Sequence, residues 1–351
     1  MFKYNVYYLL MNKYSNKGLS GLQNLGNTCF INSSIQCLFN IYELIDIIEN
    51  IDLEKKINNK PDSIMLLEWN KLRKMIYNDN CIISPGGFVT SVRKISRIKN
   101  KELFSGFSQN DLPEFLLFMI DCFHNSLSRE VDMNINGKVI NDKDKMAKIS
   151  YEMMKNMYKK EFSEILTLFY GIHISVIVDD KNRILSRSPE PFLNISLPIP
   201  EFDKPTLYDC FNLYTEHESL SGDNAWYNES TGLKQHVTKK LIFWSLPKIM
   251  IIDLKRFNYI NLEKNKKHVH FELENLDMRN YVNEYYSESY IYDLFAICNH
   301  VGSKECGHYF SYIRNANNKW YKYDDTDVNE IKDHSNLITS DAYCLFYRKK
   351  K

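Results

Sequence analysis

The 351-residue chain changes its local pattern near residue 165, and this change limits the folds that it can adopt. Beyond that point the sequence consists of short runs rich in β-branched and aromatic residues, bounded by turn signals, which predict strands. The clearest runs are GIHISVIV, KIMIIDLKRF, YDLFAICNH, HYFSYIR, KWYKYDD and AYCLFYRK. The preceding part lacks such runs and shows helical periodicity instead. We therefore expect an α+β fold, with a helical first half followed by a mainly β second half.

Three helices are predicted in the first half. From Cys29 onwards, apolar residues recur with helical spacing as far as Ile45, with Asn27 and Thr28 as candidate N-caps. A second apolar stripe begins at Leu112, and Pro113 is tolerated in its first turn. A third helix is predicted over 143–162, and residues 126–142 are predicted to form a loop.

Composition and charge exclude several classes of protein. Hydrophobic residues make up 44% of the chain and charged residues 25%, which is typical of a globular protein with a large core. The net charge of +1 gives no indication of a nucleic-acid or acidic-lipid partner. The apolar patch near the N-terminus is broken by Asn5 and is too short to cross a membrane. We interpret residues 1–19 as an added strand or arm, and we expect no membrane partner. We expect a cytoplasmic location. A nuclear location, or the host cytoplasm if the protein is viral, stays open.

The eight cysteines are scattered, and no two are spaced as Cys-x-x-Cys. In a long chain of this composition, that spacing argues against a disulfide framework and against a zinc site made of paired thiolates. We expect most of these cysteines to be small buried hydrophobic residues.

Cys29 is the cysteine whose position suggests chemistry. It follows a Gly-Asn-Thr turn and begins a predicted helix. A helix N-terminus favours an anion, so it favours the thiolate, which is the nucleophilic form of cysteine. The same position would also suit an ordinary buried thiol. A catalytic role would require a base, a group that orients the base, and a donor for the oxyanion.

Candidates for all three groups occur elsewhere in the sequence. His308 begins a strand-like alternation and could be the base, although a lone histidine often has only a structural role. Asp324 and Asp325 follow an aromatic strand, and one of them could accept a hydrogen bond from the imidazole. The alternative is an acidic turn after a hairpin strand. Asn24 offers a side-chain amide to an oxyanion, or is simply a turn residue.

Together these segments resemble the ubiquitin-specific proteases, a family of papain-like deubiquitinases. GLQNLGNTCFINSSIQCL resembles their Cys box, and NHVGSKECGHYFSYIRNANNKWYKYDDTDV resembles their His box. Between the boxes, FSQNDLPEFLLFMIDCF resembles a helix with the family's Gln-Asp-Glu pattern. The segments EFSEILTLFYG, PFLNISLPIP, LPKIMIIDLKRF and AYCLFYR follow in family order. The resemblance extends from about residue 20 to residue 348.

The resemblance implies a role for each site residue. Cys29 matches the nucleophile, His308 the general base, and Asp324 the third member of the triad. Asp325 matches a second carboxylate that supports the site, and Asn24 matches the oxyanion residue. The implied fold is that of a papain-like cysteine protease, with a helical thumb over about 20–165 and a mainly antiparallel β palm and fingers over about 166–348. The implied substrates are ubiquitin and ubiquitinated proteins, and no cofactor is implied.

Two acidic residues, Asp111 and Glu114, are expected to bind the substrate. They lie three residues apart near the start of the second predicted helix, so they share one face. Acidic residues in a first turn also stabilise a helix through its dipole, which is the simpler interpretation. By resemblance they fall where the family binds the ubiquitin tail, whose two arginines can pair with carboxylates.

The chain departs from the family pattern in three places. Many members carry two Cys-x-x-Cys pairs that bind zinc in the fingers, but the matching stretches VIVDDKNRILS and WYNESTGLKQ contain no cysteine. A thiolate site cannot form there, and three isolated histidines (His173, His217 and His236) are poor replacements. We therefore predict fingers without metal, held by ordinary packing. Pro113 and Asn110 also depart from the usual residues, but neither is a triad position.

Two other functions stay open at the level of sequence. The chain could be a catalytically inactive ubiquitin-binding scaffold, although inactive members usually lose the cysteine or the histidine, and both are present here. It could also be an isopeptidase for a ubiquitin-like modifier with a similar basic tail. The order Cys, His, Asp along the chain argues against the fold of SUMO-type proteases, whose order is His, Asp, Cys.

Overall fold

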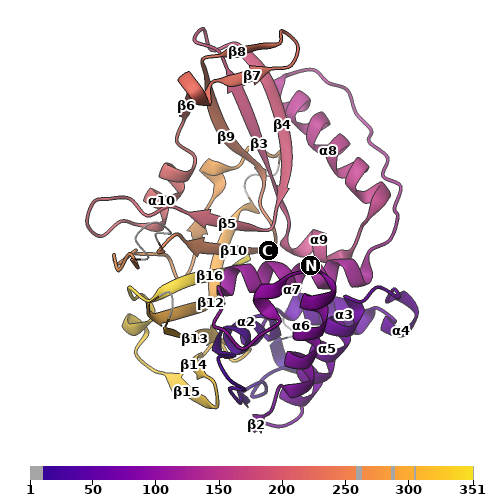
Figure 1. The fold of residues 1–351 in the computed structure, drawn as a ribbon, viewed down its shortest axis with the longest axis vertical. Coiled ribbons are helices and arrows are strands. Elements are labelled where there is room, and N and C mark those ends of the chain that lie inside the picture. Colours follow the sequence, from indigo (N-terminus) through magenta and orange to yellow (C-terminus); the bar gives the residue numbers. More distant parts are fainter. Residues whose placement is uncertain (1–10, 258–262, 286–288, 304–305, 351) are drawn as a thin grey trace.

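A computed structural model describes residues 11–257, 263–285, 289–303 and 306–350 (Figure 1). Helices dominate the part before residue 170 and strands the part after it, which confirms the α+β prediction. The helices are α2 (Cys29–Phe39), α3 (Tyr42–Asn50), α4 (Leu53–Lys56), α5 (Ser63–Ile76), α6 (Gly86–Ile98), α7 (Leu112–Leu127), α8 (Asp142–Lys160), α9 (Glu164–Phe169) and α10 (Leu207–Tyr214). Within these described ranges, no helix is both long enough and apolar enough to span a bilayer.

The predicted helix from Cys29 to Ile45 is in fact two helices, α2 and α3. Asn40 ends α2, and its side chain donates to the carbonyl of Gln36 (3.0 Å), a local bond that competes with helix continuation. Thr28 occupies the N-cap position of α2, as predicted, but neither of the two proposed residues caps the helix with its side chain. The Thr28 hydroxyl accepts from the backbone N–H of Leu25 (2.8 Å) instead of capping α2, and the Asn27 side chain donates to the carbonyl of Phe107 (2.9 Å).

A large sheet forms the palm, in the order β15-β14-β13-β12-β16-β10-β5, with β11 paired to β12. All of its pairings are antiparallel except β10 with β5. Its strands are β5 (Asn194–Leu197), β10 (Ile249–Leu254), β11 (Leu276–Asp277), β12 (Ile291–Gly302), β13 (Gly307–Arg314), β14 (Trp320–Asp324), β15 (Asp327–Ile331) and β16 (Ala342–Lys349). Five of the six predicted strands lie in this sheet.

A second sheet extends away from the palm, at the top of Figure 1, in the order β4-β3-β9-β6. It holds the remaining predicted strand, and α8 packs against it. The strands are β3 (Gly171–Val178), β4 (Ile184–Phe192), β6 (Glu218–Leu220) and β9 (Val237–Ser245); a hairpin of β7 (Trp226–Asn228) and β8 (Leu233–Gln235) lies near its tip. These strands form the fingers.

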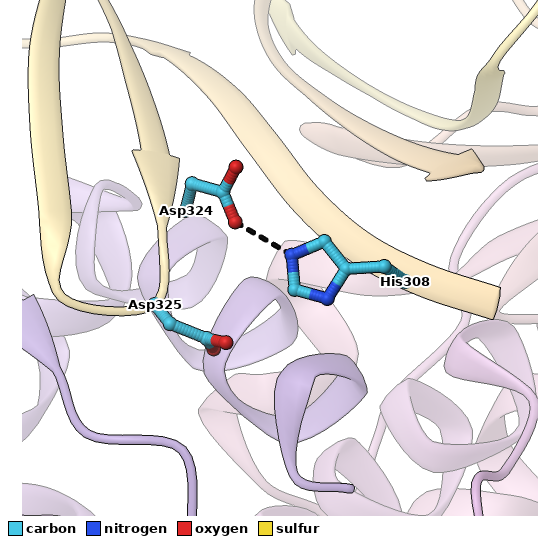
Figure 2. Close-up of side chains that lie close together, drawn as sticks. All are labelled: His308, Asp324 and Asp325. Carbon is cyan, nitrogen blue, oxygen red and sulfur yellow. Dashed lines mark hydrogen bonds and ion pairs between the residues drawn. The ribbon is translucent and has the colours of Figure 1, made fainter.

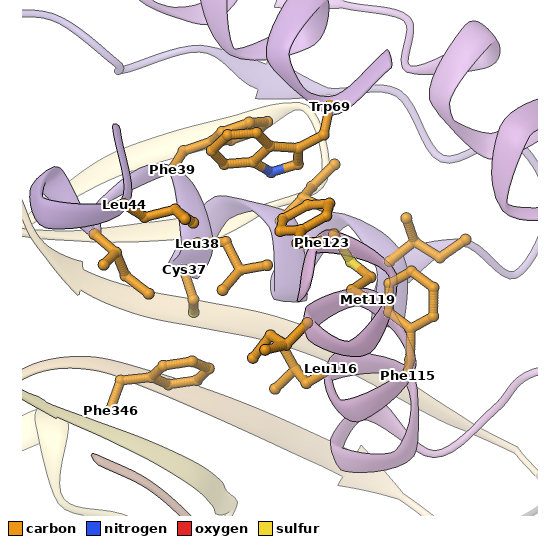
Figure 3. Close-up of a cluster of buried hydrophobic side chains, with 14 of the residues drawn as sticks. Cys37, Leu38, Phe39, Leu44, Trp69, Phe115, Leu116, Met119, Phe123 and Phe346 are labelled. Atoms are coloured by element: carbon orange, nitrogen blue, oxygen red, sulfur yellow. The ribbon is translucent and has the colours of Figure 1, made fainter. Parts of the chain in front are cut away.

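The core fixes α2 between the helices of the thumb and the palm sheet. Every residue of α2 is buried, and the helix lies against α7 on one side and against β12, β13 and β14 on another. Phe39 stacks on Trp69 (5.3 Å between ring centroids), which in turn packs on Phe123 of α7 (Figure 3). Since burying such a side chain contributes about 1.5–3 kcal/mol, the helix that begins with Cys29 is held firmly.

The N-terminal arm lies partly outside the described residues, which begin at Met11. Residues 11–13 form a helical turn, not a strand. The arm then docks on the C-terminal half, where Ser15 Oγ donates to Asn317 Oδ1 (2.6 Å). The short strands β1 (Gly21–Leu22) and β2 (Ile82–Ile83) pair in parallel just beyond it. All eight cysteines are free thiols and six are buried, as the sequence predicted.

Candidate active site

Cys29 is the first residue of α2, and its side chain is only 1% exposed. The turn that precedes it is folded around the side chain of Asn24, whose Oδ1 accepts from the backbone N–H groups of Gly26 (3.1 Å) and Thr28 (3.1 Å). Gly26 has φ +92°, a left-handed conformation that favours glycine. The turn therefore delivers the thiol to a helix N-terminus, where the dipole favours a thiolate.

His308 lies near the start of β13 and connects the thiol to a carboxylate. Its Nε2 lies 2.6 Å from Oδ1 of Asp324 (Figure 2). Hydrogen bonding to the Cys29 thiol, and then to Asp324, raises the pKa of His308 to about 9 against the opposing effect of burial. Because Nε2 is engaged by Asp324, Nδ1 is the ring nitrogen left for the thiol. The imidazole therefore has a thiol and a carboxylate as its neighbours, the groups that a nucleophile–base–carboxylate triad requires.

Asp324 is the last residue of β14, and two cationic groups contact it. Oδ1 faces His308, while Oδ2 lies 2.7 Å from Nζ of Lys322. Burial alone would raise the pKa of Asp324, but the hydrogen bonds from Lys322 and His308 outweigh it and hold that pKa below its ordinary value. The carboxylate is therefore ionised when it faces the imidazole.

Asp325, the neighbouring carboxylate, faces the Cys box instead of the imidazole. Its Oδ2 accepts from Asn24 Nδ2 (2.9 Å), its Oδ1 from Asn32 Nδ2 (2.8 Å), and its backbone carbonyl from the N–H of Leu22 (2.7 Å). Asp325 adopts φ +50° in the two-residue turn between β14 and β15, a conformation uncommon for residues other than glycine. It therefore joins the hairpin that carries Asp324 to both the Asn24 turn and α2.

Within the described ranges, one group of side chains has the donor types and spacing of a metal site. It consists of His308, Asp324 and Asp325. Ligand atoms of His308, Asp324 and Asp325 all lie within 4.8 Å of one another. Each of them is already engaged: His308 with Asp324, Asp324 also with Lys322, and Asp325 with two asparagine amides. This bonding suits proton transfer between a thiol and an imidazole.

Comparison with known proteins identifies the family. Residues 20–347 match the family described as ubiquitin carboxyl-terminal hydrolase. The chain belongs to this family. It is 32% identical over 346 residues to ubiquitin carboxyl-terminal hydrolase 2 of Bos taurus, covering 96% of this chain and 56% of that protein. It is 31% identical over 341 residues to the Gallus gallus protein of the same name, covering 94% of this chain and 93% of the relative.

Solved structures confirm the papain-like ubiquitin carboxyl-terminal hydrolase fold. A chain in the structure of the SAGA Ubp8/Sgf11/Sus1/Sgf73 DUB module bound to ubiquitin aldehyde matches with a TM-score of 0.71 and 25% identity, covering 96% of this chain and 71% of that one. The resemblance to the ubiquitin-specific proteases is therefore confirmed. The present chain spans just over half the length of the mammalian relatives that it matches.

The two acids predicted to bind the substrate line a pair of adjoining cavities beside the site. Asp111 and Glu114 contribute to both cavities, of about 290 and 440 Å³. Asp111 occupies the N-cap position of α7 but makes no capping bond with its side chain, and both of its oxygens accept from the Tyr343 hydroxyl (3.1 and 3.0 Å). Asp111 therefore does not cap α7, and both acids border a space in which a ligand could lie.

The turns at the tip of the fingers are closed by side-chain hydrogen bonds. Asp179 Oδ1 accepts from the backbone N–H groups of Lys181 (3.0 Å) and Arg183 (2.8 Å). Asn228 Oδ1 accepts from the N–H of Ser230 (3.0 Å), while its Nδ2 donates to Gln235 Oε1 (3.2 Å). Both residues lie in the stretches where many family members carry zinc-binding cysteines. Each turn thus has a carboxylate or amide oxygen that accepts one or more of its N–H groups.

Sequence reasoning missed three residues that contact the triad or the residues beside it. Gln109 pairs with the backbone of Gly307, accepting its N–H (2.9 Å) and donating to its carbonyl, and so ties the thumb to the residue before His308. Asn32 and Lys322 contact Asp325 and Asp324, as described above. Asn32 lies one helical turn after Cys29, and Lys322 lies two residues before Asp324 on a strand. Both spacings place the two side chains on one face of their element, and this is the signal that could have revealed Asn32 and Lys322.

Proposed function

We propose that this protein is a thiol isopeptidase that hydrolyses the bond after the C-terminal glycine of ubiquitin. The observation that carries the proposal is the position of His308, whose Nε2 is hydrogen-bonded to Asp324 (2.6 Å) while the Cys29 thiol raises the pKa of His308. Membership of the ubiquitin carboxyl-terminal hydrolase family and the likeness to a structure bound to ubiquitin aldehyde support the choice of substrate.

The first half of the reaction forms a thioester on Cys29. The thiolate attacks the carbonyl carbon of the terminal glycine, and the carbonyl electron pair moves to oxygen. We assign the side-chain amide of Asn24 and the N–H groups at the start of α2 as donors to this oxyanion, since both lie at the Cys box turn. The C–N bond then breaks, its electron pair goes to nitrogen, and the imidazolium of His308 gives that nitrogen a proton.

The second half releases ubiquitin. Neutral His308 takes a proton from water, the resulting hydroxide attacks the thioester, and the C–S bond breaks to restore the thiolate. Asp324 stays ionised throughout and keeps the imidazole oriented, as the carboxylate does in other triads. Asp325 supports Asn24 and makes no contact with the proton that moves.

The cavities beside the triad suit the basic tail of ubiquitin. They are lined by three carboxylates, those of Asp111, Glu114 and Asp253, together with one lysine, Lys255. Arginines of an extended tail can form bidentate pairs with such carboxylates. Phe257, His300 and Tyr309 add ring surfaces to the smaller cavity.

Hydrolysis of ubiquitin with a fluorogenic amide at its C-terminus tests the proposal. The wild-type protein should release the fluorophore, and Cys29→Ala should abolish release while it still binds ubiquitin, because the thiol forms the covalent bond and contributes little to affinity. Cys81→Ala is the matched control, since Cys81 is an exposed thiol far from the triad in sequence. A wild-type protein that binds ubiquitin but does not cleave it would be a scaffold. Cleavage only of a ubiquitin-like modifier would change the substrate.

A further inference from the structure

The triad carboxylate is shared between two cationic groups, and only one of them belongs to the triad. Oδ1 of Asp324 faces Nε2 of His308 (2.6 Å), and Oδ2 faces Nζ of Lys322 (2.7 Å). The Lys322 ammonium also lies 4.4 Å from the centre of the Phe310 ring, which gives it a second attractive contact.

The hairpin geometry explains how the lysine reaches this position. Side chains two residues apart on a strand point to the same face, so β14 presents Lys322 and Asp324 together. By the same rule β13 presents His308, Phe310 and Tyr312 on one face, and Tyr312 pairs directly with Lys322 across the strands. The lysine and aspartate side chains are 37% and 28% exposed, so the pair is shielded more than a typical surface salt bridge.

We propose that Lys322 is a positioning residue that occupies Oδ2 of Asp324 and thereby sets how readily His308 gives its proton to the leaving amine. The proposal rests on the proposed function. When the C–N bond breaks and its electron pair goes to nitrogen, His308 must release a proton to that nitrogen. A carboxylate that faced only the imidazolium would hold this proton more tightly. By sharing the carboxylate charge, Lys322 keeps the imidazolium an effective acid.

Other charged or titratable groups near the carboxylate do not replace Lys322. Asp327 pairs with Asp324 across the turn and is exposed, and Asp325 is engaged by two asparagine amides. Both are acidic, so they would stabilise the imidazolium further, which is the opposite of the effect proposed for Lys322.

The remaining groups face the imidazole or the lysine. On β12, burial and then the nearby Lys264 lower the pKa of His300 to about 4, so that histidine is neutral. Burial raises the pKa of Tyr312, which lies opposite Lys322, so it too is neutral. The Cys29 thiol raises the pKa of His308 and does not contact the carboxylate. The lysine is therefore the cation that contacts the carboxylate beside the imidazole.

The test is the pH dependence of kcat/KM for a fluorogenic ubiquitin amide, measured for wild type, Lys322→Met, Lys322→Gln and Lys322→Arg. The alkaline limb reports the pKa of His308 in the free enzyme. Removal of the cation should move this limb upwards by about 0.5 pH unit, the size expected for a partly solvated charge a few ångströms away. Lys322→Arg should restore the wild-type limb, and high salt should shrink the difference.

Lys319→Met is the matched control, because Lys319 forms an ion pair with Glu330 (3.1 Å) on the same hairpin without touching the triad. It should leave the limb unchanged. The proposal would be overturned if the alkaline limb stayed at the same pH, or moved to lower pH, in both Lys322→Met and Lys322→Gln. An equal loss of rate at every pH would also overturn it, because that is what a purely structural role predicts. If wild type and Lys319→Met do not cleave ubiquitin, the proposed function fails instead. The pH dependence of Cys29 alkylation by iodoacetamide would then still report whether Lys322 acts on His308.

Discussion

The adjacent carboxylates Asp324 and Asp325 should differ sharply in what their loss does to catalysis. Asp324→Ala removes the acceptor of His308 and so frees the imidazole. Asp325→Ala leaves that pair intact and instead releases the amides of Asn24 and Asn32. The two substitutions therefore test two different parts of the site.

The structure sets the expected sizes of the two losses. Removal of a triad carboxylate lowers kcat by ~10⁴ in a well-studied triad, and we expect a loss of that order for Asp324→Ala. Complete loss of an oxyanion donor costs ~10²–10³ in kcat, which is an upper limit for Asp325→Ala. The limit is not reached in full, because the backbone N–H groups of Gly26 and Thr28 still hold the Asn24 side chain.

Single-turnover hydrolysis of a ubiquitin amide, at saturating enzyme, gives these losses directly. Asp325→Asn is the control for the backbone, since asparagine tolerates the φ of +50° that alanine would adopt only with strain. The double variant Asn24→Ala/Asp325→Ala should lose less than the product of the two single losses, because Asp325 acts partly through Asn24 and partly through its bonds to Asn32 and Leu22. A larger loss in Asp325→Ala than in Asp324→Ala would show that the two roles are reversed.

Three further predictions concern the surroundings of the triad. Gln109→Ala removes both bonds to Gly307 and should lower kcat by about 10–100-fold with little change in KM, whereas Asn110→Ala should not; equal rates for the two would remove Gln109 from the site. Asp111→Arg should raise KM for ubiquitin substrates steeply while Cys29 still reacts normally with a small thiol reagent; a wild-type rate would mean that other residues hold the tail. Activity and thermal stability should persist in a chelator, and a stoichiometric zinc ion lost together with the fold would contradict this.

The sequence predicted the elements whose pattern is local and strong. The strand β3 matches its predicted run residue for residue, and α7 and α8 lie within two residues of their predicted starts. The boundary between α2 and α3 was missed because the apolar spacing continues across Asn40, whose side chain ends the first helix through a local bond. The helices α5 and α6 were not predicted; they pack against each other, and α5 also packs against α7.

The sequence predicted which residues make up the site, but not which of them contact one another. The Cys and His boxes placed Cys29, His308, Asp324, Asp325 and Asn24, and the structure brings all five together. The two aspartates have different partners because of the turn after β14, which points Asp325 towards α2. The contacts of Gln109 and Asn32 join positions about 200 and 290 residues apart, and no local pattern encodes such pairings.

The central claim is that Cys29, activated by His308, attacks the C-terminal carbonyl of ubiquitin. The most direct measurement is mass spectrometry after incubation with ubiquitin that carries a C-terminal electrophile, beside matching probes made from ubiquitin-like modifiers. The account predicts one covalent adduct per chain, mapped to Cys29, that forms fastest with the ubiquitin probe and is slowed strongly by His308→Ala. An adduct on another cysteine, or none with a folded wild-type protein, would contradict it.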